Sequence, residues 1–239
     1  MQNRDLIEQL VEHLSSAPLR GSQVAGLPRS WFDQPRVNVP ASDPGQYESF
    51  TLDQLREEAL GCRRCRLCET RNKVVFGVGN ANSPLIAFVG EGPGADEDRL
   101  GEPFVGRAGE LLTAAITKGL GLERSEVYIA NVVKCRPPQN RAPLPDETEA
   151  CTKFLYRQLE LVKPRVIVTL GQPAQLALSG VNLGITKLRG QWQTWRGIRL
   201  MPTFHPAYLL RNPPAKKEFW QDLKAVMAEL GIQREDARS

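Results

Sequence analysis

Five cysteines stand in this chain at spacings that could bind a metal. Cys62 and Cys65 are separated by two residues, and Cys135 and Cys151 by fifteen. Two such pairs of thiolates are enough for a tetrahedral zinc ion or for an iron-sulfur cluster of the 4Fe-4S type. Cys68 forms a second C-x-x-C pair with Cys65 and is therefore a fifth candidate ligand. The alternative for Cys135 and Cys151 is that both are buried core thiols that bind nothing.

A glycine-rich loop, residues 90–109, is a second place where chemistry could occur. Its glycines allow main-chain N–H groups to come close to a bound molecule. The loop also carries four acidic residues between positions 91 and 98, which disfavour a bare phosphate because phosphate prefers lysine or arginine. The loop therefore predicts a site for a polar, roughly neutral group, and the alternative is a tight turn with acidic, solubilising residues.

Asn131 lies in an apolar run, residues 127–133, that predicts a buried strand. Asparagine is disfavoured in a strand rich in β-branched residues, and a buried amide needs hydrogen-bond partners. The amide offers both a donor and an acceptor, and it matches the edge of uracil, which presents O4 as an acceptor and N3–H as a donor; cytosine presents the reverse. Asn131 is therefore a candidate base-reading residue, and the alternative is that it ties two strands together.

His205 is one of two histidines in the chain, and the other, His13, lies near the N-terminus. It precedes Pro206, and proline favours extended backbone geometry at the residue before it. His205 is therefore predicted to be the hydrogen-bond donor of a site on a loop. The alternative is a loop histidine that bonds a main-chain carbonyl.

The elements that must position these residues follow from hydrophobic periodicity. The chain has 239 residues, of which 41% are hydrophobic, enough for one sizeable core. Apolar runs predict strands at 74–76, 85–89, 127–133 and 166–170, and a hairpin from 192–195 and 198–201. Helices are predicted at 52–60, 108–120, 146–162, 171–178 and 216–230. This alternation predicts an α/β fold with a parallel sheet covered on both faces.

Composition limits the class of protein further. The net charge of +4 is compatible with a nucleic-acid partner but does not demonstrate one. No apolar run is long enough for a transmembrane span, and the first residues lack the apolar core of a signal peptide. We therefore expect a cytoplasmic, nucleoid-associated protein in a reducing compartment, where cysteines are ligands or reactive thiols rather than disulfides.

The first part of the chain differs from the rest. Residues 5–14 predict a short amphipathic helix, and residues 15–47 are rich in proline, glycine and serine, which predicts a flexible linker. The sequence therefore divides into an N-terminal extension at 1–50, one domain at 51–232 and a polar tail at 233–239.

Three segments, in chain order, resemble motifs of the family 4 uracil-DNA glycosylases. The first reads GEGPG from residue 90 and continues through residues 101–109. The second reads NVVKCRPPQNRAPLP from residue 131, and the third reads HPAYLLRNP from residue 205. The resemblance covers about residues 52–230 and leaves the extension outside it.

The resemblance implies a three-layer α/β/α fold around a central, mainly parallel four-stranded sheet. It implies a monofunctional DNA glycosylase, a hydrolase that flips uracil out of DNA and cleaves its N-glycosidic bond, leaving an abasic site for base excision repair. The related class that traps DNA covalently carries a basic insertion ending in histidine after the middle strand. Residues 135–141 read CRPPQNR instead, so we expect ordinary hydrolysis.

The resemblance also implies roles for individual residues. It implies an iron-sulfur cluster rather than zinc, with the ligands Cys62, Cys65, Cys135 and Cys151. Cys68 is then not a ligand. The uracil pocket that it implies contains Glu91, Gly92, Pro93, Phe104, Asn131 and His205. Within this pocket Phe104 stacks on the flipped base, Asn131 reads O4 and N3–H, and neutral His205 donates to O2. Glu97 or Asn140 positions water, and the residues expected near DNA phosphates are Arg107, Arg141 and Arg211.

Two other functions remain open from the sequence. One is a DNA-binding module of the replication or repair machinery that is cross-linked by the cluster and has no catalytic activity. The other is a redox protein that uses the cluster for electron transfer. For the glycosylase, the expected partner is uracil-containing DNA, single- or double-stranded. We expect a monomer with no membrane partner, and an extension that binds a replication or repair partner.

Overall fold

The computed structural model of the chain describes residues 46–233. The predicted helix at 5–14, nearly all of the predicted linker and residues 234–239 of the predicted tail lie outside the described residues. Within the described part, no helix is both long and apolar enough to cross a membrane.

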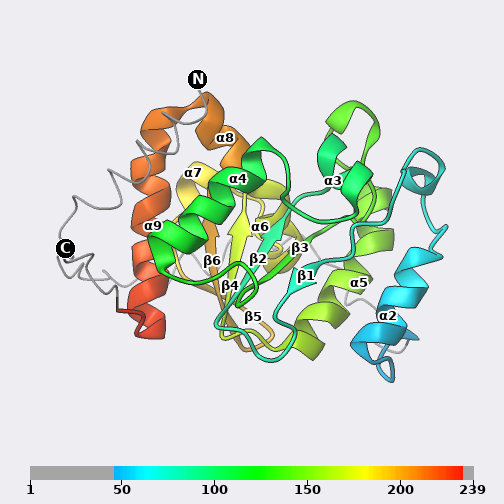
Figure 1. The fold of residues 1–239 in the computed structure, drawn as a ribbon, viewed down its shortest axis with the longest axis horizontal. Helices are drawn as coiled ribbons and strands as arrows, with labels where there is room; N and C mark the ends of the chain where they lie inside the picture. The colour runs from blue at the N-terminus through cyan, green and yellow to red at the C-terminus, as the bar shows by residue number, and fades with distance from the viewer. Residues whose placement is uncertain (1–45, 234–239) are drawn as a thin grey trace.

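The strands within residues 46–233 form one six-stranded sheet in the order β1-β3-β2-β4-β6-β5 (Figure 1). The four central strands run parallel to one another, and the two edge strands pair antiparallel. The parallel centre confirms the expected four-stranded sheet, and the short edge strands β1 and β5 extend it. The strands are β1 Val78–Gly79, β2 Ile86–Gly90, β3 Tyr128–Asn131, β4 Val166–Leu170, β5 Gln193–Trp195 and β6 Ile198–Thr203.

Helices cover both faces of the sheet and complete the three layers (Figure 1). Helices α4, α8 and α9 pack on one face, and α2, α5 and α6 pack on the other. A π-helical segment, Ala115–Leu120, continues α4, and single 3-10 turns lie at Arg66–Glu69, Pro138–Asn140 and Pro213–Ala215. The α-helices of the described part are α2 Leu52–Leu60, α3 Ala95–Leu100, α4 Arg107–Ala114, α5 Pro145–Val162, α6 Gln172–Ser179, α7 Ile185–Leu188, α8 Pro206–Arg211 and α9 Lys216–Leu230.

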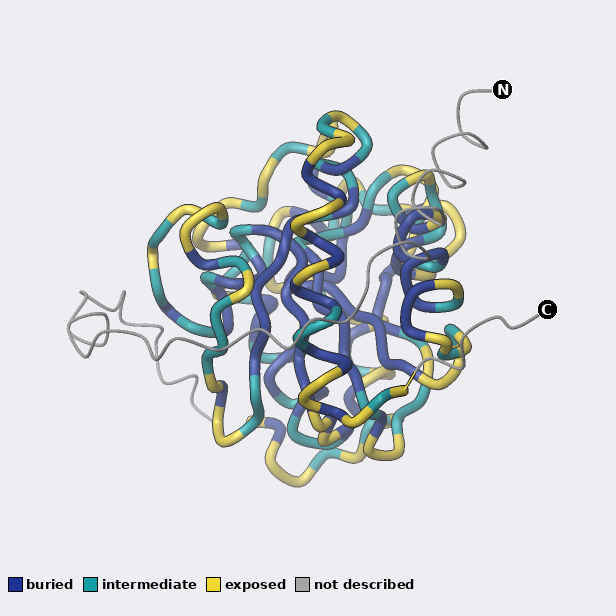
Figure 2. Tube along the Cα trace, turned by 90° about the vertical axis from the view of Figure 1, so that its left-hand side faces the viewer, coloured by how far each residue is buried: buried dark blue, intermediate teal, exposed yellow. Residues whose placement is uncertain are grey.

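The central strands are buried between the two helix layers (Figure 2). In β2, Ile86 and Phe88 pack with α4 and α9, whereas Ala87 and Val89 pack with α2 and α5. Because successive side chains of a strand point to opposite faces, both faces of this strand must be apolar. This explains why the run appears in the sequence as continuously hydrophobic rather than alternating.

One predicted strand was wrong. Residues 74–76 do not join the sheet, and the chain reaches its edge only at β1. Val75 and Phe76 are nevertheless buried, and the Val75 N–H donates to the Lys134 carbonyl over 2.8 Å. This segment is apolar because it fills the core on the α5 side of the sheet, not because it pairs in a ladder.

The last residues of the predicted extension pack against the domain. Tyr47 is buried and stacks on Phe154 of α5, with ring centroids 5.1 Å apart. Arg157, also on α5, donates to the main-chain carbonyls of Glu48 and Phe50 over 2.6 and 3.0 Å. Residues 46–50 are therefore held by α5 as part of the folded domain.

Candidate active site

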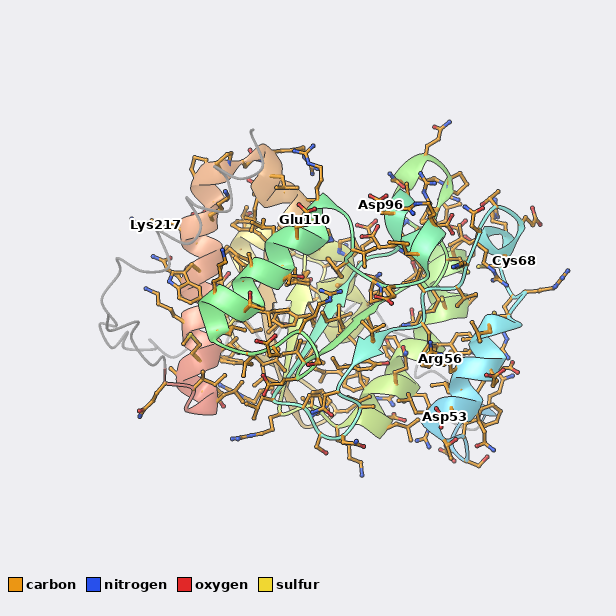
Figure 3. All side chains as sticks on the ribbon, in the orientation of Figure 1. Asp53, Arg56, Cys68, Asp96, Glu110 and Lys217 are labelled. Carbon is orange, nitrogen blue, oxygen red and sulfur yellow. The ribbon has the colours of Figure 1, made fainter. Side chains whose placement is uncertain are left out.

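The carboxyl ends of strands β2, β3 and β6 meet at one edge of the sheet, and the segments that follow them surround a cavity of about 430 Å³. That volume suits a small-molecule site. Asp96, labelled in Figure 3, marks helix α3, whose Glu97 lines the cavity. Apart from the cysteines and Arg107, the cavity brings together all the predicted site residues: Glu91, Gly92, Pro93, Glu97, Phe104, Asn131, Asn140, Arg141, His205 and Arg211.

Asn131 is the last residue of β3 and lines this cavity. The residue is 2% exposed, and its Oδ1 has no hydrogen-bond partner among the described residues. Gly90 is its register partner on β2, and a Cβ at Gly90 would lie 2.5 Å from Asn131 Oδ1 and 2.5 Å from Phe104 Cζ. Glycine at this position therefore allows the amide and the aromatic ring to occupy the same corner of the cavity.

Phe104 has a strained backbone, with φ at +53° in the left-handed region that aromatic residues rarely adopt. Its ring is buried and lies 5.6 Å from the His205 ring, centroid to centroid. Gly109 of α4 makes this conformation possible, because a Cβ there would lie 2.0 Å from the Phe104 carbonyl carbon. The ring of Phe104 is thus held beside His205 by a strained backbone conformation.

We expect Gly109→Ala to displace Phe104. The added methyl group must move main-chain atoms, so the free energy of unfolding should fall by about 1–3 kcal/mol and the affinity for free uracil should fall with it. Denaturant unfolding and equilibrium dialysis with labelled uracil measure both. Gly184→Ala is the matched control, because a Cβ there meets nothing closer than 3.8 Å. Unchanged uracil affinity in Gly109→Ala would show that Phe104 does not form the base-binding face.

His205 is the N-cap residue of α8, and its Nδ1 accepts from the Ala207 N–H over 3.1 Å. A neutral ring that accepts at Nδ1 carries its proton on Nε2. The pKa of His205 is lowered to about 4, chiefly by burial and to a smaller extent by the charge of Arg211, against an opposing effect of the charge of Glu97. At neutral pH the residue is therefore an uncharged Nε2–H donor beside the cavity.

This depressed pKa predicts how stability depends on pH. In the unfolded chain a histidine titrates near 6.5, so between pH 6.5 and about 4 the unfolded state binds a proton that the folded state does not. Stability from this residue is therefore present above pH 6.5 and is lost as the pH falls, by about 2 kcal/mol between pH 7 and 5. Denaturant unfolding of the wild type and His205→Gln should show this slope only in the wild type. Parallel pH profiles would contradict a buried neutral His205.

Glu97 joins the two halves of the glycine-rich loop. Its carboxylate accepts from the N–H groups of Gly94, Val105 and Gly106 over 3.0–3.1 Å. The oxygens are therefore occupied by main-chain donors, and Glu97 holds the loop as a fixed negative charge at the cavity. The neighbouring Asp98 is 1% exposed and similarly accepts from the N–H of Asn72 over 2.8 Å.

The loop after β3 forms the opposite rim of the cavity. Asn140 is exposed there with φ at +56°, and its Oδ1 accepts from Arg136 Nε over 2.7 Å. Arg141 is committed to Glu147, which is fully buried, through two bonds of 2.7 and 2.6 Å. The guanidinium of Arg141 thus ties the rim to α5, and the residue also lines the cavity. Arg107 is exposed at the first position of α4, outside the cavity lining.

All five cysteines line a second, apolar cavity, between the loop that follows α2, where Cys68 is labelled in Figure 3, and α5. The cysteines are not joined in disulfides. Arg71 Nη1 donates to Cys135 Sγ over 3.1 Å, and the Lys134 N–H donates to Cys151 Sγ over 3.2 Å. Burial raises the pKa of the Cys151 thiol to about 12, so a thiolate there needs nearby positive charge. Within residues 46–233, no three His, Cys, Asp or Glu side chains are arranged to hold a metal ion.

Comparison with known proteins identifies the family. Residues 76–224, which include the cavity and all three motifs, match the family model of the uracil DNA glycosylase superfamily. The chain belongs to that superfamily. The type-4 uracil-DNA glycosylase of Sulfurisphaera tokodaii is 44% identical over 190 residues, covering 76% of this chain and 86% of that protein. The type-4 enzyme of Thermotoga maritima is 48% identical over 163 residues, covering 67% and 84%. These relatives confirm the resemblance to the type-4 glycosylases.

Sequence patterns missed a buried network behind the glycosylase cavity. Thr203, at the end of β6, donates to Asp222 Oδ2 over 2.6 Å, and Arg189 Nε donates to the same oxygen over 3.0 Å. These hydrogen bonds connect α9 to the end of β6, which leads to His205. Burial raises the pKa of Asp222 to about 6. A signal was present, because Asp222 lies three residues after Phe219 and four before Val226, on the apolar face of the predicted helix.

Proposed function

We propose that this chain is a monofunctional uracil-DNA glycosylase that hydrolyses the N-glycosidic bond of a flipped uracil and leaves an abasic site for base excision repair. One observation carries the proposal. Asn131 with its open amide, uncharged His205 and the ring of Phe104 come from three separate motifs and line one cavity of suitable size. The type-4 names of the relatives support the same activity.

Recognition of uracil rests on Asn131 and Phe104. The Asn131 Oδ1 accepts from N3–H and its Nδ2 donates to O4, a pairing that cytosine cannot make. Phe104 stacks on the flipped base and recovers part of the cost of leaving the helix. Glu91, Gly92 and Pro93, which line the cavity beside Asn131, complete the pocket.

Catalysis rests on His205. As the glycosidic bond breaks, negative charge develops on the leaving uracil, and the Nε2–H of His205 donates to O2. One preorganised donor of this kind lowers the barrier by about 3–4 kcal/mol. Glu97 keeps a fixed carboxylate at the cavity, where it stabilises the positive charge on the sugar, and Asn140 at the rim positions the attacking water. The residues that contact the phosphates are Arg107, Arg141 and Arg211, and Arg141 also holds the rim through Glu147.

The proposal includes a 4Fe-4S cluster bound by the cysteines of the second cavity. Four of its thiols, Cys62, Cys65, Cys135 and Cys151, come from two segments far apart in the sequence. Three cationic residues, Arg64, Arg71 and Lys134, line the same cavity. Four thiols suit either a zinc ion or a 4Fe-4S cluster, and the resemblance to the type-4 glycosylases favours the cluster. When bound, the cluster supplies a structural cross-link between the loop after α2 and α5, and it takes no part in bond cleavage.

The proposal also covers partners and location. The substrate is uracil-containing DNA, single- or double-stranded, and the net charge of +4 supports such a partner. The enzyme acts as a monomer in the cytoplasm at the nucleoid. The extension at 1–50 lies outside the matched residues, which supports a role apart from catalysis, such as binding a replication or repair partner.

The proposed pocket is tested by base selectivity. Anaerobically purified wild type and Asn131→Ala are incubated with matched oligonucleotides that carry uracil, cytosine or thymine at one position, and abasic sites are counted after alkaline cleavage. We expect cleavage only at uracil in the wild type and a loss of about tenfold or more in the variant. No abasic sites in the wild type, with the DNA still bound, would favour the non-catalytic binding module.

A further inference from the structure

A buried lysine lies between the two cavities. Lys134 is 2% exposed and follows Asn131 by three residues. Its Nζ donates to the Asn131 main-chain carbonyl over 2.7 Å, and the residue also lines the cysteine cavity. Its own N–H donates to Cys151 Sγ. One residue is therefore in contact with both the base-reading strand end and a proposed cluster ligand.

The Asn131 carbonyl depends on this lysine. β3 ends at Asn131, and the next two N–H groups, of Val132 and Val133, donate to the carbonyls of Gly90 and Glu91. These bonds occupy the N–H groups of the turn. The Asn131 carbonyl lies beyond the end of the paired strand and takes part in neither bond. The Lys134 ammonium supplies its hydrogen bond. A buried carbonyl that loses its donor is destabilised, so the main chain that carries the Asn131 amide would shift.

Lys134 also faces the cysteine cavity. Cys135 and Cys151 face it from the cysteine cavity, Phe76 lies beside it with its ring centroid 6.0 Å from Nζ, and Arg71 on the same cavity adds a further positive charge. A cluster held by four thiolates is anionic and supplies the balance for both cations.

We infer that Lys134 is a positioning residue that couples the cluster to the uracil pocket: its main-chain N–H donates to the cluster ligand Cys151, and its Nζ holds the main chain of Asn131. The inference rests on the proposed function. It means that the cluster contributes to base binding as well as to folding, through one hydrogen bond to Asn131.

Two variants and a control test this coupling in the cluster-loaded protein. Lys134→Met removes the charge and the donor, and Lys134→Gln removes the charge but keeps an amide donor. Gln158→Met is the control, because Gln158 is a fully buried residue of the same core that donates to the Phe76 carbonyl and to Tyr128 and lines neither cavity. The readouts are the reduction potential of the cluster by protein-film voltammetry and the Kd of free uracil by equilibrium dialysis.

We expect both Lys134 variants to have a more negative reduction potential than the wild type, because a cation beside the cluster stabilises its reduced form. The Kd of uracil should rise about tenfold in Lys134→Met and less in Lys134→Gln. Gln158→Met should lower thermal stability and leave both readouts unchanged.

An unchanged potential or an unchanged Kd in Lys134→Met would overturn the coupling. If Lys134→Met does not fold, an unchanged potential in Lys134→Gln would overturn it equally. The wild type shows which proposal has failed. If it binds uracil and carries a cluster, only the coupling is overturned; if the proposed function is wrong, the wild type itself does not bind uracil.

Discussion

Replacing His205 by alanine is expected to lower kcat for uracil release by about 10²–10³-fold. The substitution removes the Nε2–H that donates to uracil O2 while charge develops there, an interaction made mainly in the transition state. The affinity for DNA should change little, because contacts with phosphates dominate it. Single-turnover release of uracil and a separate DNA-binding titration measure the two quantities on the same preparations.

His13→Ala is the matched control for this experiment, because it removes the other histidine of the chain, which lies outside the described residues. It should retain the wild-type rate. A His205→Ala protein that releases uracil at the wild-type rate would contradict the assignment of the donor and would strengthen the alternatives in which this histidine has no catalytic role.

Serine in place of Cys151 is expected to remove the cluster and with it most of the stability of the domain. Cys151 lies on α5, and its thiolate is the proposed link between this helix and the loop after α2. A structural metal site contributes its binding energy to folding, so loss of one ligand should lower the free energy of unfolding by several kcal/mol. Iron content, absorption near ~400 nm and denaturant unfolding measure the loss.

Cys68→Ser is the control for the ligand set, because Cys68 lines the same cavity but is the thiol left over. It should keep the iron content and the stability of the wild type. If Cys68→Ser loses its iron while Cys62→Ser or Cys65→Ser retains it, the ligand set is wrong and Cys68 is a ligand.

The parallel strands and the helices that cover them could be predicted from the sequence because their signals are local. β2 and β4 are buried at every position and, apart from Thr169, carry no polar side chain, which suits a strand between two helix layers. Residues 74–76 show the limit of this signal. They are equally apolar and buried, but burial alone does not determine whether a segment pairs with a strand.

The candidate site could be predicted where residue type alone restricts the chemistry. Asn131 is an amide at the end of an apolar strand and His205 is a histidine before a proline, and both line the cavity. What the sequence could not provide was how charged groups are paired. Arg141 is expected at a phosphate, and the sequence does not show that its guanidinium also bonds Glu147, six residues later, in the folded rim.

Two further features depend on long-range packing and left no sequence signal strong enough to use. The left-handed backbone of Phe104 requires the absence of a side chain at Gly109. This requirement arises from the space between the two residues in the folded protein, and conformational propensity does not reveal it. Lys134 stands in a motif as one more basic residue, and its burial between two cavities appears only when β3, α5 and the loop after α2 are brought together.

Glycosylase activity is tested most directly by single-turnover release of free uracil from a uracil-containing oligonucleotide, with anaerobically purified protein in excess over the DNA. We expect one uracil and one abasic site for each oligonucleotide bound, and we expect release to be slowed about 10²–10³-fold by His205→Ala. Oligonucleotide that is fully bound by an iron-containing protein but retains its uracil would contradict this expectation, and would identify the chain as a DNA-binding module cross-linked by the cluster.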